Sequence, residues 1–262
     1  MEFNSAIFLF LAFPIVIALY FILGKTYKNV YLFIINILFY AFAEPIFILL
    51  LLGSLGANFG LTILMDKKRE NKKISKAILI ILICLNLGLL IFFKYFMFLN
   101  DLVCGILGWF GIVGESVLKI ALPLGISFFT FQAISYCVDV YKGQVRCATN
   151  FIKFGVYFSF FAQITAGPIV RYKDVESQLD ERKVTVDDFT YGIKRLLIGL
   201  TQKIIFANYF SKIANSIFSM PATSLGGLTA WGGYCFIRYK FILTLQVIRQ
   251  WQLELQGSLG LS

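Results

Sequence analysis

The sequence predicts an all-α polytopic membrane protein, from its composition and from the length of its apolar stretches. Of its 262 residues, 59% are hydrophobic and 15% are charged, and the mean hydropathy is +0.80. A soluble domain of this length needs far more charge to cover its surface. Several apolar stretches approach the roughly 20 residues that a helix needs to cross a bilayer. The net charge of +10 therefore indicates basic cytoplasmic loops, and no nucleic-acid partner is expected.

The apolar stretches predict the helices in chain order. Residues 6–24 lack a basic leader and a small-residue cleavage site, so they are expected to form an uncleaved transmembrane helix. Residues 30–65 are too long for one crossing. Glu44 and Pro45 predict a turn that divides them into two helices, because proline disfavours a helical residue before it. The later apolar segments are residues 77–99, a short glycine-rich piece at 102–114, and two spans at 117–141 and 151–169.

Basic residues predict the orientation of the first helices. Six lysine and arginine residues lie between Met65 and Ala77, so this loop is expected on the cytoplasmic side. Counting back through two helices places Lys25 and Lys28 on the same side. The N-terminus, which carries Glu2 and no basic residue, is then expected outside.

Residues 171–189 are polar and of mixed charge, which predicts a surface loop. Thr185 to Asp188 can cap the helix that follows, with the Asp188 carboxylate in its first turn. That helix is predicted over residues 189–210 and carries Lys194, Arg195, Gln202 and Lys203 in an otherwise apolar sequence. Two placements are open: along the cytoplasmic interface, or through a region lined by protein.

The stretch from Leu122 to Gly143 combines apolar and polar residues. When residues 117–141 are drawn as a helix, one sector contains Gly125, Gln132, Ser135, Tyr136 and Asp139, and the opposite side is Phe, Ile and Val. A polar stripe on a membrane helix points inward. Hydrogen bonding between helices and a substrate path explain this pattern equally well, and solvation at the membrane interface also explains Asp139.

A second mixed stretch runs from Phe160 to Arg171. Gln163 and Thr165 precede Ala166-Gly167-Pro168, which is expected to break the helix. A broken helix leaves carbonyl groups that lipid cannot satisfy, so the break is expected to face protein, water or a ligand. Arg171 could bind an anionic headgroup, a phosphate or a carboxylate, or simply extend to the interface.

The chain offers no complete catalytic constellation. It contains no histidine, no Gly-x-Ser-x-Gly elbow and no glycine loop that would hold a phosphate. Five scattered cysteines fit no metal-binding spacing, so no metal is expected and they are interpreted as small buried hydrophobic residues. A disulfide between Cys137 and Cys147 stays open, since spacing alone does not fix pairing.

These residues resemble the membrane-bound O-acyltransferase family, in particular its bacterial branch that acetylates alginate. The likeness is strongest in Leu122–Gly143 and Asn150–Arg171, and it is weaker in Gly192–Asn208. The sequence departs from the family pattern at Ala162, at Thr201-Gln202 and at Asn208. Further segments that carry the likeness are Met1–Phe10, Phe39–Pro45 and Phe93–Tyr95.

The resemblance implies a multi-helix enzyme of the bacterial cytoplasmic membrane. Such an enzyme transfers an acyl group, often acetyl, to a hydroxyl of an exported polysaccharide or another envelope polymer. The implied acyl donor is acyl-CoA, an acyl carrier protein or a similar thioester, with no cofactor bound permanently. An extracytoplasmic acyl-transfer protein is the implied partner. The candidates for lining the substrate path are Gln132, Asp139, Gln163 and Arg171.

The family's essential histidine lies in a later helix, and no residue here can take its role as the base. The resemblance therefore implies that the chain is truncated and inactive alone. A transporter or flippase for an envelope precursor is an alternative, because broken polar helices also build transport paths, but paired repeats are missing. A subunit with only a binding or regulatory role is a third possibility.

Residues 1–231 are interpreted as the N-terminal part of the acyltransferase domain, and residues 232–262 as an aberrant tail. The family continues after Trp231 with a Tyr-Phe-Asp-Phe-x-Gly-Tyr-Ser signature, which this chain lacks. Permitted codons for the residues from Tyr239 onward, read in a shifted frame, can spell that signature. A frameshift near Gly232–Tyr234 is our hypothesis, and the sequence of the gene would test it.

Overall fold

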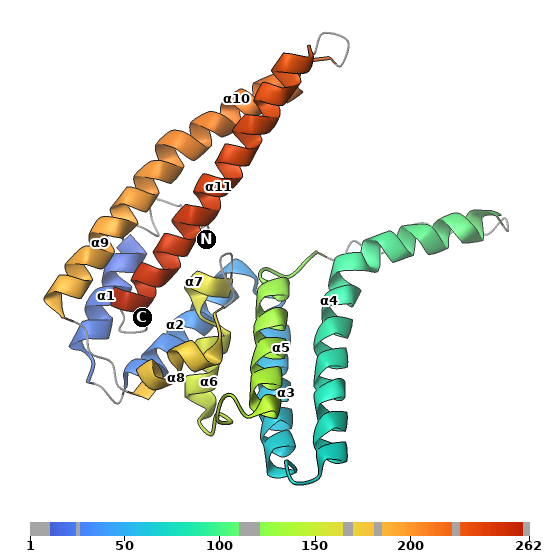
Figure 1. Ribbon diagram of the computed structural model, residues 1–262, viewed down its shortest axis with the longest axis vertical. Coiled ribbons are helices and arrows are strands. Elements are labelled where there is room, and N and C mark those ends of the chain that lie inside the picture. Colours follow the sequence, from blue (N-terminus) through green and yellow to red (C-terminus); the bar gives the residue numbers. More distant parts are fainter. Residues whose placement is uncertain are drawn as a thin grey trace. The chain divides into compact units, whose positions relative to one another are not determined.

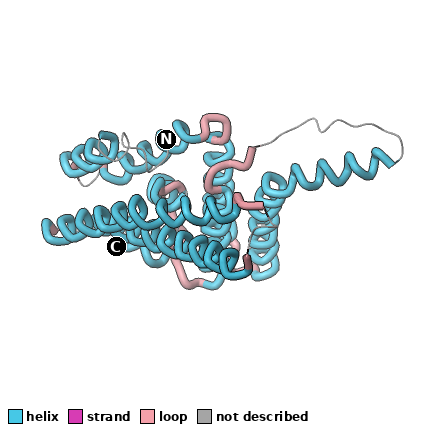
Figure 2. Tube along the Cα trace, turned by 90° about the horizontal axis from the view of Figure 1, so that it is seen from above, coloured by secondary structure: helices cyan, strands magenta, loops and turns pink. Residues whose placement is uncertain are grey.

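The regular elements that the structure describes are helices. The computed structural model describes residues 11–24, 27–109, 121–164, 170–180, 185–221 and 226–258. Within these segments every regular element is a helix, which confirms the all-α prediction (Figures 1 and 2). Two helical stretches, Ile48–Lys67 and Lys72–Phe96, are long and apolar enough to cross a membrane, by length and composition. The chain divides into unit 1, mainly Met1–Thr165 with Ile169–Asp174, and unit 2, mainly Val175–Ser262.

Unit 1 begins with helices α1 (Phe13–Ile22), α2 (Lys28–Ala43) and α3 (Ile48–Lys67). Residues 6–10 of the first predicted span lie outside the described segments. The predicted turn before Pro45 is confirmed. Glu44 leaves the helical region with φ −141° and ψ 74°, and its N–H donates to the Tyr40 carbonyl at 2.8 Å.

Helix α4 (Lys72–Trp109) is longer than predicted. The expected division between residues 99 and 102 is wrong, because the helix continues through Asn100 and Asp101 and bends along its length (Figure 1). No glycine or proline lies between Phe96 and Cys104 to end it. The predicted residues 110–114 lie outside the described segments.

The start of the next span is also corrected. Helix α5 (Ile126–Lys142) begins nine residues later than predicted, after Gly125 in the left-handed conformation at φ 71°. Residues 117–120 lie outside the described segments. The predicted span at 151–169 is broken into α6 (Phe151–Phe158) and α7 (Phe161–Ile164), so the break falls at Ser159 and Phe160. The expected break at Ala166-Gly167-Pro168 is outside the described residues.

Helix α5 packs against α3 and α4 and also against α6 and α7. The side of α5 opposite the polar stripe, described above as Phe, Ile and Val, also carries the buried Cys137, which shares a hydrogen bond of 3.3 Å with Thr62 of α3. Beside them, Asn58 of α3 and Asn86 of α4 donate to each other's amide oxygens at 3.2 and 2.7 Å. Both asparagines are fully buried, so these bonds fix how the two helices pack.

Replacing Asn58 by leucine should destabilise the protein by about 1–3 kcal/mol, because the Asn86 amide then loses its buried partner. The double replacement Asn58→Leu/Asn86→Leu should cost at least about 1 kcal/mol less than the sum of the two single changes. Denaturation in detergent measures all three. Combining Asn58→Leu with a leucine at the exposed Asn215 is the control and should be additive, and additivity in both pairs would contradict the expected coupling.

Unit 2 contains most of α8 (Tyr172–Asp180), then α9 (Val186–Thr201), the π-helical turn η2 (Gln202–Ala207), α10 (Asn208–Phe218) and α11 (Gly227–Ser258). Helix α8 corrects the predicted loop at 171–189. Its residues Tyr172, Val175 and Leu179 are buried and recur at helical spacing, which gives the segment an apolar face. Helix α9 begins three residues before the predicted position. Helix α11 packs along α9, η2 and α10 and includes residues 232–258 of the tail, whose origin stays a hypothesis.

Candidate functional site

The candidate path residues Gln132 and Gln163 meet where α5 packs against α6 and α7. Gln132 Nε2 donates to the Tyr157 carbonyl at 2.9 Å and to Gln163 Oε1 at 3.4 Å. The two side chains are 5% and 6% exposed. Gln132 therefore makes interhelical hydrogen bonds, one of the two explanations that the polar stripe left open, and it satisfies a carbonyl next to the broken helix.

Asn36 of α2 bonds to backbone groups on both sides of the break between α6 and α7. This residue was not among the candidates predicted from the sequence. Its Nδ2 donates to the Val156 carbonyl at 3.5 Å, and its Oδ1 accepts from the Phe161 N–H at 3.2 Å. Asn36 is fully buried. One amide thus serves a backbone acceptor and a backbone donor on either side of the break. The available signal was a lone asparagine in the apolar stretch 30–43.

Asp139 lies on the same face of α5 as Gln132, seven residues and about 10 Å further along the helix axis. It is 6% exposed, and its Oδ2 has no hydrogen-bond partner among the described residues. The prediction that Asp139 is solvated at an interface is therefore wrong for this carboxylate. A buried acceptor without a partner is costly, which makes Asp139 the candidate residue with most to gain from a further contact.

Arg171 is exposed and does not join the other three candidates through any hydrogen bond or ion pair in the described segments. Its neighbour Tyr172 packs in an aromatic cluster, with its ring 5.0 Å from the rings of both Tyr136 and Tyr157. The Tyr157 hydroxyl donates to the Val170 carbonyl at 3.1 Å. The structure thus brings Gln132 and Gln163 together, aligns Asp139 with them along α5, and leaves Arg171 at the surface.

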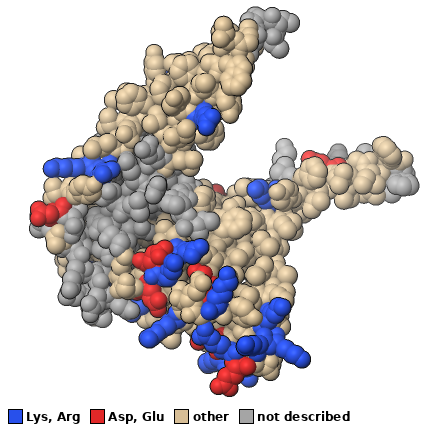
Figure 3. All heavy atoms as spheres, viewed as in Figure 1, with Lys and Arg blue, Asp and Glu red and all other residues tan. Residues whose placement is uncertain are grey.

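Basic side chains gather where α3 turns into α4 (Figure 3). Arg69 lies 3.8 Å from Asp66, and both are well exposed, so this ion pair contributes little to stability. The guanidinium of Arg69 also covers Gly143 at the end of α5, since a Cβ added there would collide with it. The basic turn and the end of α5 therefore lie at the same end of unit 1. Exposed members of the basic cluster are Lys67, Lys68, Arg69, Lys72, Lys73 and Lys76.

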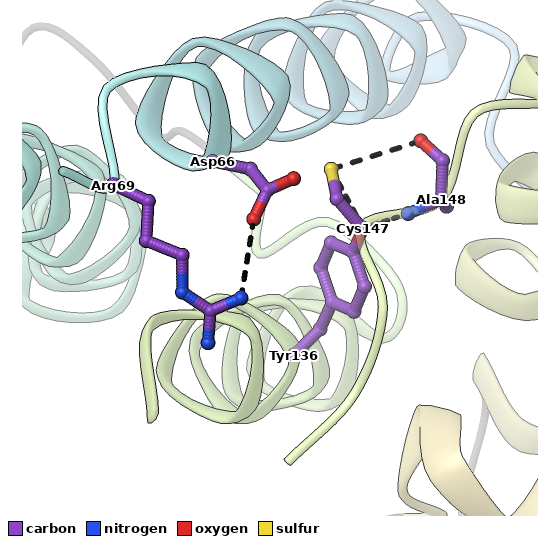
Figure 4. Close-up of polar contacts among 5 residues, drawn as sticks. All are labelled: Asp66, Arg69, Tyr136, Cys147 and Ala148. Atoms are coloured by element: carbon purple, nitrogen blue, oxygen red, sulfur yellow. Dashed lines mark hydrogen bonds and ion pairs between the residues drawn. The ribbon is translucent and has the colours of Figure 1, made fainter. Parts of the chain in front are cut away.

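Cys147 lies beside this end, in the loop between α5 and α6 (Figure 4). The Tyr136 hydroxyl approaches its Sγ at 3.8 Å and accepts from the Ala148 N–H at 2.9 Å. Partial burial raises the pKa of the Cys147 thiol. The Tyr136 hydrogen bond lowers this pKa by a smaller amount, and the Asp66 carboxylate adds the smallest effect, a further rise. The thiol is therefore protonated at neutral pH and is a poor nucleophile. All five cysteines are free, so the open alternative of a Cys137–Cys147 disulfide is not what the structure holds.

The described residues are arranged for packing and polar contacts between helices. None of the described segments brings together three metal-ligating side chains. The buried polar groups found here are amides, hydroxyls and one carboxylate. Such groups can position a substrate. Deprotonating a substrate hydroxyl also requires a base within hydrogen-bonding distance of that hydroxyl.

Comparisons with known proteins show that the chain is similar to bacterial acyltransferases. It is 34% identical over 233 residues to the probable alginate O-acetylase AlgI of Pseudomonas aeruginosa, which covers 89% of this chain and 44% of that protein. It is 30% identical to the peptidoglycan O-acetyltransferase of Helicobacter pylori, over 87% of this chain and 48% of that protein. A shorter match, 27% identical over 40% of this chain and 26% of the relative, is with the teichoic acid D-alanyltransferase of Streptococcus thermophilus.

The chain spans about half the length of these two O-acetyltransferase relatives. No family model matches it. The match to the alginate relative covers 89% of the chain, so most of the segments in which the family resemblance was recognised lie within it. From this similarity, the chain is related to these bacterial O-acetyltransferases, in agreement with its resemblance to the membrane-bound O-acyltransferase family.

Proposed function

We propose that the chain contributes the helices of unit 1 to a membrane enzyme that transfers an acyl group to a hydroxyl of a cell-envelope polymer. The observation that supports this most is its 34% identity, over 89% of its length, to a probable alginate O-acetylase. The other relatives are named for acetyl transfer to peptidoglycan and D-alanyl transfer to teichoic acid. The polymer differs among these names, whereas the transfer of an acyl group is common to them.

The protein is proposed to cross the bacterial cytoplasmic membrane several times, with its N-terminus outside. The basic turn between α3 and α4 then faces the cytoplasm, as the distribution of lysine and arginine predicts. The acyl donor is proposed to be acyl-CoA, an acyl carrier protein or a similar thioester, and the acceptor an exported polysaccharide. An extracytoplasmic acyl-transfer protein is the proposed partner.

Gln132, Gln163 and Asp139 are proposed to line the region through which a substrate reaches the reacting centre. Gln132 and Gln163 would act by holding the wall formed by α5, α6 and α7 in place. Asp139 would accept a hydrogen bond from a hydroxyl, because its buried Oδ2 has no partner in the described structure. Arg171, at the surface, would bind an anionic group. None of them is assigned the proton transfer itself.

A chimera tests the acyl-transfer proposal. The 233 aligned residues would replace their counterparts in the Pseudomonas aeruginosa relative, and acetyl esters on the exported alginate would be measured per amount of inserted protein. The chimera should restore esters to a strain that lacks its own acetylase. Gln132→Leu should reduce them at least tenfold, whereas Gln144→Leu, a loop glutamine that is exposed, should not. A fully inserted chimera that forms no ester would overturn the proposal.

The 262-residue chain by itself is proposed to be inactive, because it has no histidine to remove the hydroxyl proton. Purified into liposomes with an acetyl thioester and an alginate oligomer, it should form no ester. Ester formation under these conditions would show that another residue of this chain serves as the base.

A further inference from the structure

We propose that residues 149–172 form a re-entrant hairpin, which enters the membrane and leaves it on the same side, next to the basic turn between α3 and α4. This inference rests on the proposed membrane arrangement, but it does not depend on the reaction. It changes the interpretation of residues 151–169, which the apolar pattern predicted as a membrane crossing. The evidence is a set of contacts along one helix, α5.

The hairpin begins beside Tyr136. The Ala148 N–H donates to the Tyr136 hydroxyl at 2.9 Å, and two residues later the Asn150 side chain caps α6 by accepting from the Ile152 and Lys153 N–H groups at 2.9 and 3.2 Å. Thr149 and Asn150 are exposed, whereas the later residues of α6 from Phe154 onward are buried. The chain therefore turns from the surface into the protein at the level of Tyr136.

From there α6 and α7 run along α5 in the opposite direction. The Phe154 ring lies 4.8 Å from the Tyr136 ring, and the Phe158 ring lies 5.8 Å from the Phe129 ring. At the far end, the Ile164 carbonyl packs against Gly125 so closely that a Cβ there would collide with it. Gly125 and Tyr136 are eleven residues apart, about 16 Å along the axis of α5. This is roughly half of the ~30 Å hydrocarbon core.

The chain then returns to Tyr136. The Val170 carbonyl accepts from the Tyr157 hydroxyl at 3.1 Å, and the Tyr172 ring lies 5.0 Å from the Tyr136 ring. Residues 165–169 lie outside the described segments. The six steps along the backbone from Ile164 to Val170 can extend over roughly 20 Å, which is enough for the return. Both ends of the segment thus contact one tyrosine, and a single crossing of the membrane would place them on opposite sides.

The charges near the two ends agree with this arrangement. Arg146 precedes the hairpin, Arg171 lies at its end and Lys173 follows it. All three side chains are exposed. The loop before the hairpin also leaves α5 at Gly143, which Arg69 covers from the basic turn. Loops rich in lysine and arginine stay on the cytoplasmic side. Non-helical backbone at membrane depth must be buried in protein, and the buried Asn36 and Gln132 satisfy this hairpin from the two neighbouring helices.

Cysteine labelling tests the hairpin in the membrane. Single cysteines would replace Thr149 and Lys173 in a background that keeps the buried Cys137 and replaces the other four. Lys68→Cys, in the basic turn, marks one side, and Asp101→Cys, past the span that ends at Phe96, marks the other. In intact cells, a membrane-impermeant maleimide should leave the cysteines at 149, 173 and 68 unlabelled and should label that at 101. After permeabilisation it should label all four.

The hairpin would be overturned if, in intact cells, the cysteines at 173 and 101 were labelled and those at 149 and 68 were not. A distance measurement gives an independent result. Spin labels at residues 149 and 173 of the protein in liposomes should be clearly closer than the ~30 Å hydrocarbon core, whereas a separation of 30 Å or more would contradict the proposal. Neither measurement involves acyl transfer, so a failed hairpin and a failed enzymatic proposal are distinguishable.

Discussion

Replacing Asn36 by leucine should destabilise the protein by about 2–4 kcal/mol, one of the two largest effects that the structure predicts. Leucine fills a similar volume, but it leaves the Phe161 N–H and the Val156 carbonyl without the partner that Asn36 provides. Each buried backbone group without a hydrogen bond costs about 1–3 kcal/mol. The loss can be measured as the shift in unfolding free energy in detergent.

Asn215→Leu is the matched control for Asn36→Leu, because Asn215 is exposed on α10 and should tolerate the change within about 0.5 kcal/mol. Equal stability of the two variants would show that the break between α6 and α7 finds other hydrogen-bond partners. Equal stability would also mean that the Asn36 hydrogen bonds do not explain why the break falls at Ser159 and not at a later residue.

Replacing Gly125 by alanine should cost about 3 kcal/mol or more. Its φ of 71° is unfavourable for a residue with a Cβ, at about 1–2 kcal/mol. The new Cβ would also collide with the Ile164 carbonyl, a backbone atom that cannot move without displacing α7. Lower thermal stability and weaker membrane insertion of Gly125→Ala should both be measurable.

Gly143→Ala is an informative comparison, because this glycine has nearly the same φ, 74°, at the other end of α5. The obstacle there is the guanidinium of Arg69, the far end of a flexible and exposed side chain that can rotate away. Gly143→Ala should therefore cost only the backbone contribution, about 1–2 kcal/mol. If both alanine variants lost the same stability, contact with Ile164 would not contribute.

Local rules predicted the parts of the fold that depend on neighbouring residues. The turn at Glu44 was predictable because proline restricts the residue before it. The short helix α8 was also accessible from the sequence, since Tyr172, Val175 and Leu179 recur at helical spacing, but its high charge led to the prediction of a loop. The start of α5 was misplaced because the helical projection ignored Pro123 and the left-handed Gly125.

The contacts that define the candidate site depend on residues far apart in the chain. Gln132 and Gln163 were both recognised as polar residues in apolar surroundings, but their spacing of 31 residues says nothing about whether they meet. The position of the break in α6 and α7 depends on Asn36, on a helix more than a hundred residues earlier. A single sequence contains no direct signal for such pairings.

The separation of Asn36 from its partners also bears on how the protein is made. The partners of its amide, the Val156 carbonyl and the Phe161 N–H, lie 120 and 125 positions later in the chain and are therefore synthesised later. At a synthesis rate of 5–20 residues per second, this corresponds to a delay of roughly 6–25 s. During that time α2 is already available for insertion, with its amide lacking both backbone partners. Until α6 and α7 have been synthesised, the Asn36 amide therefore needs other contacts, with the translocon, a chaperone or a neighbouring helix.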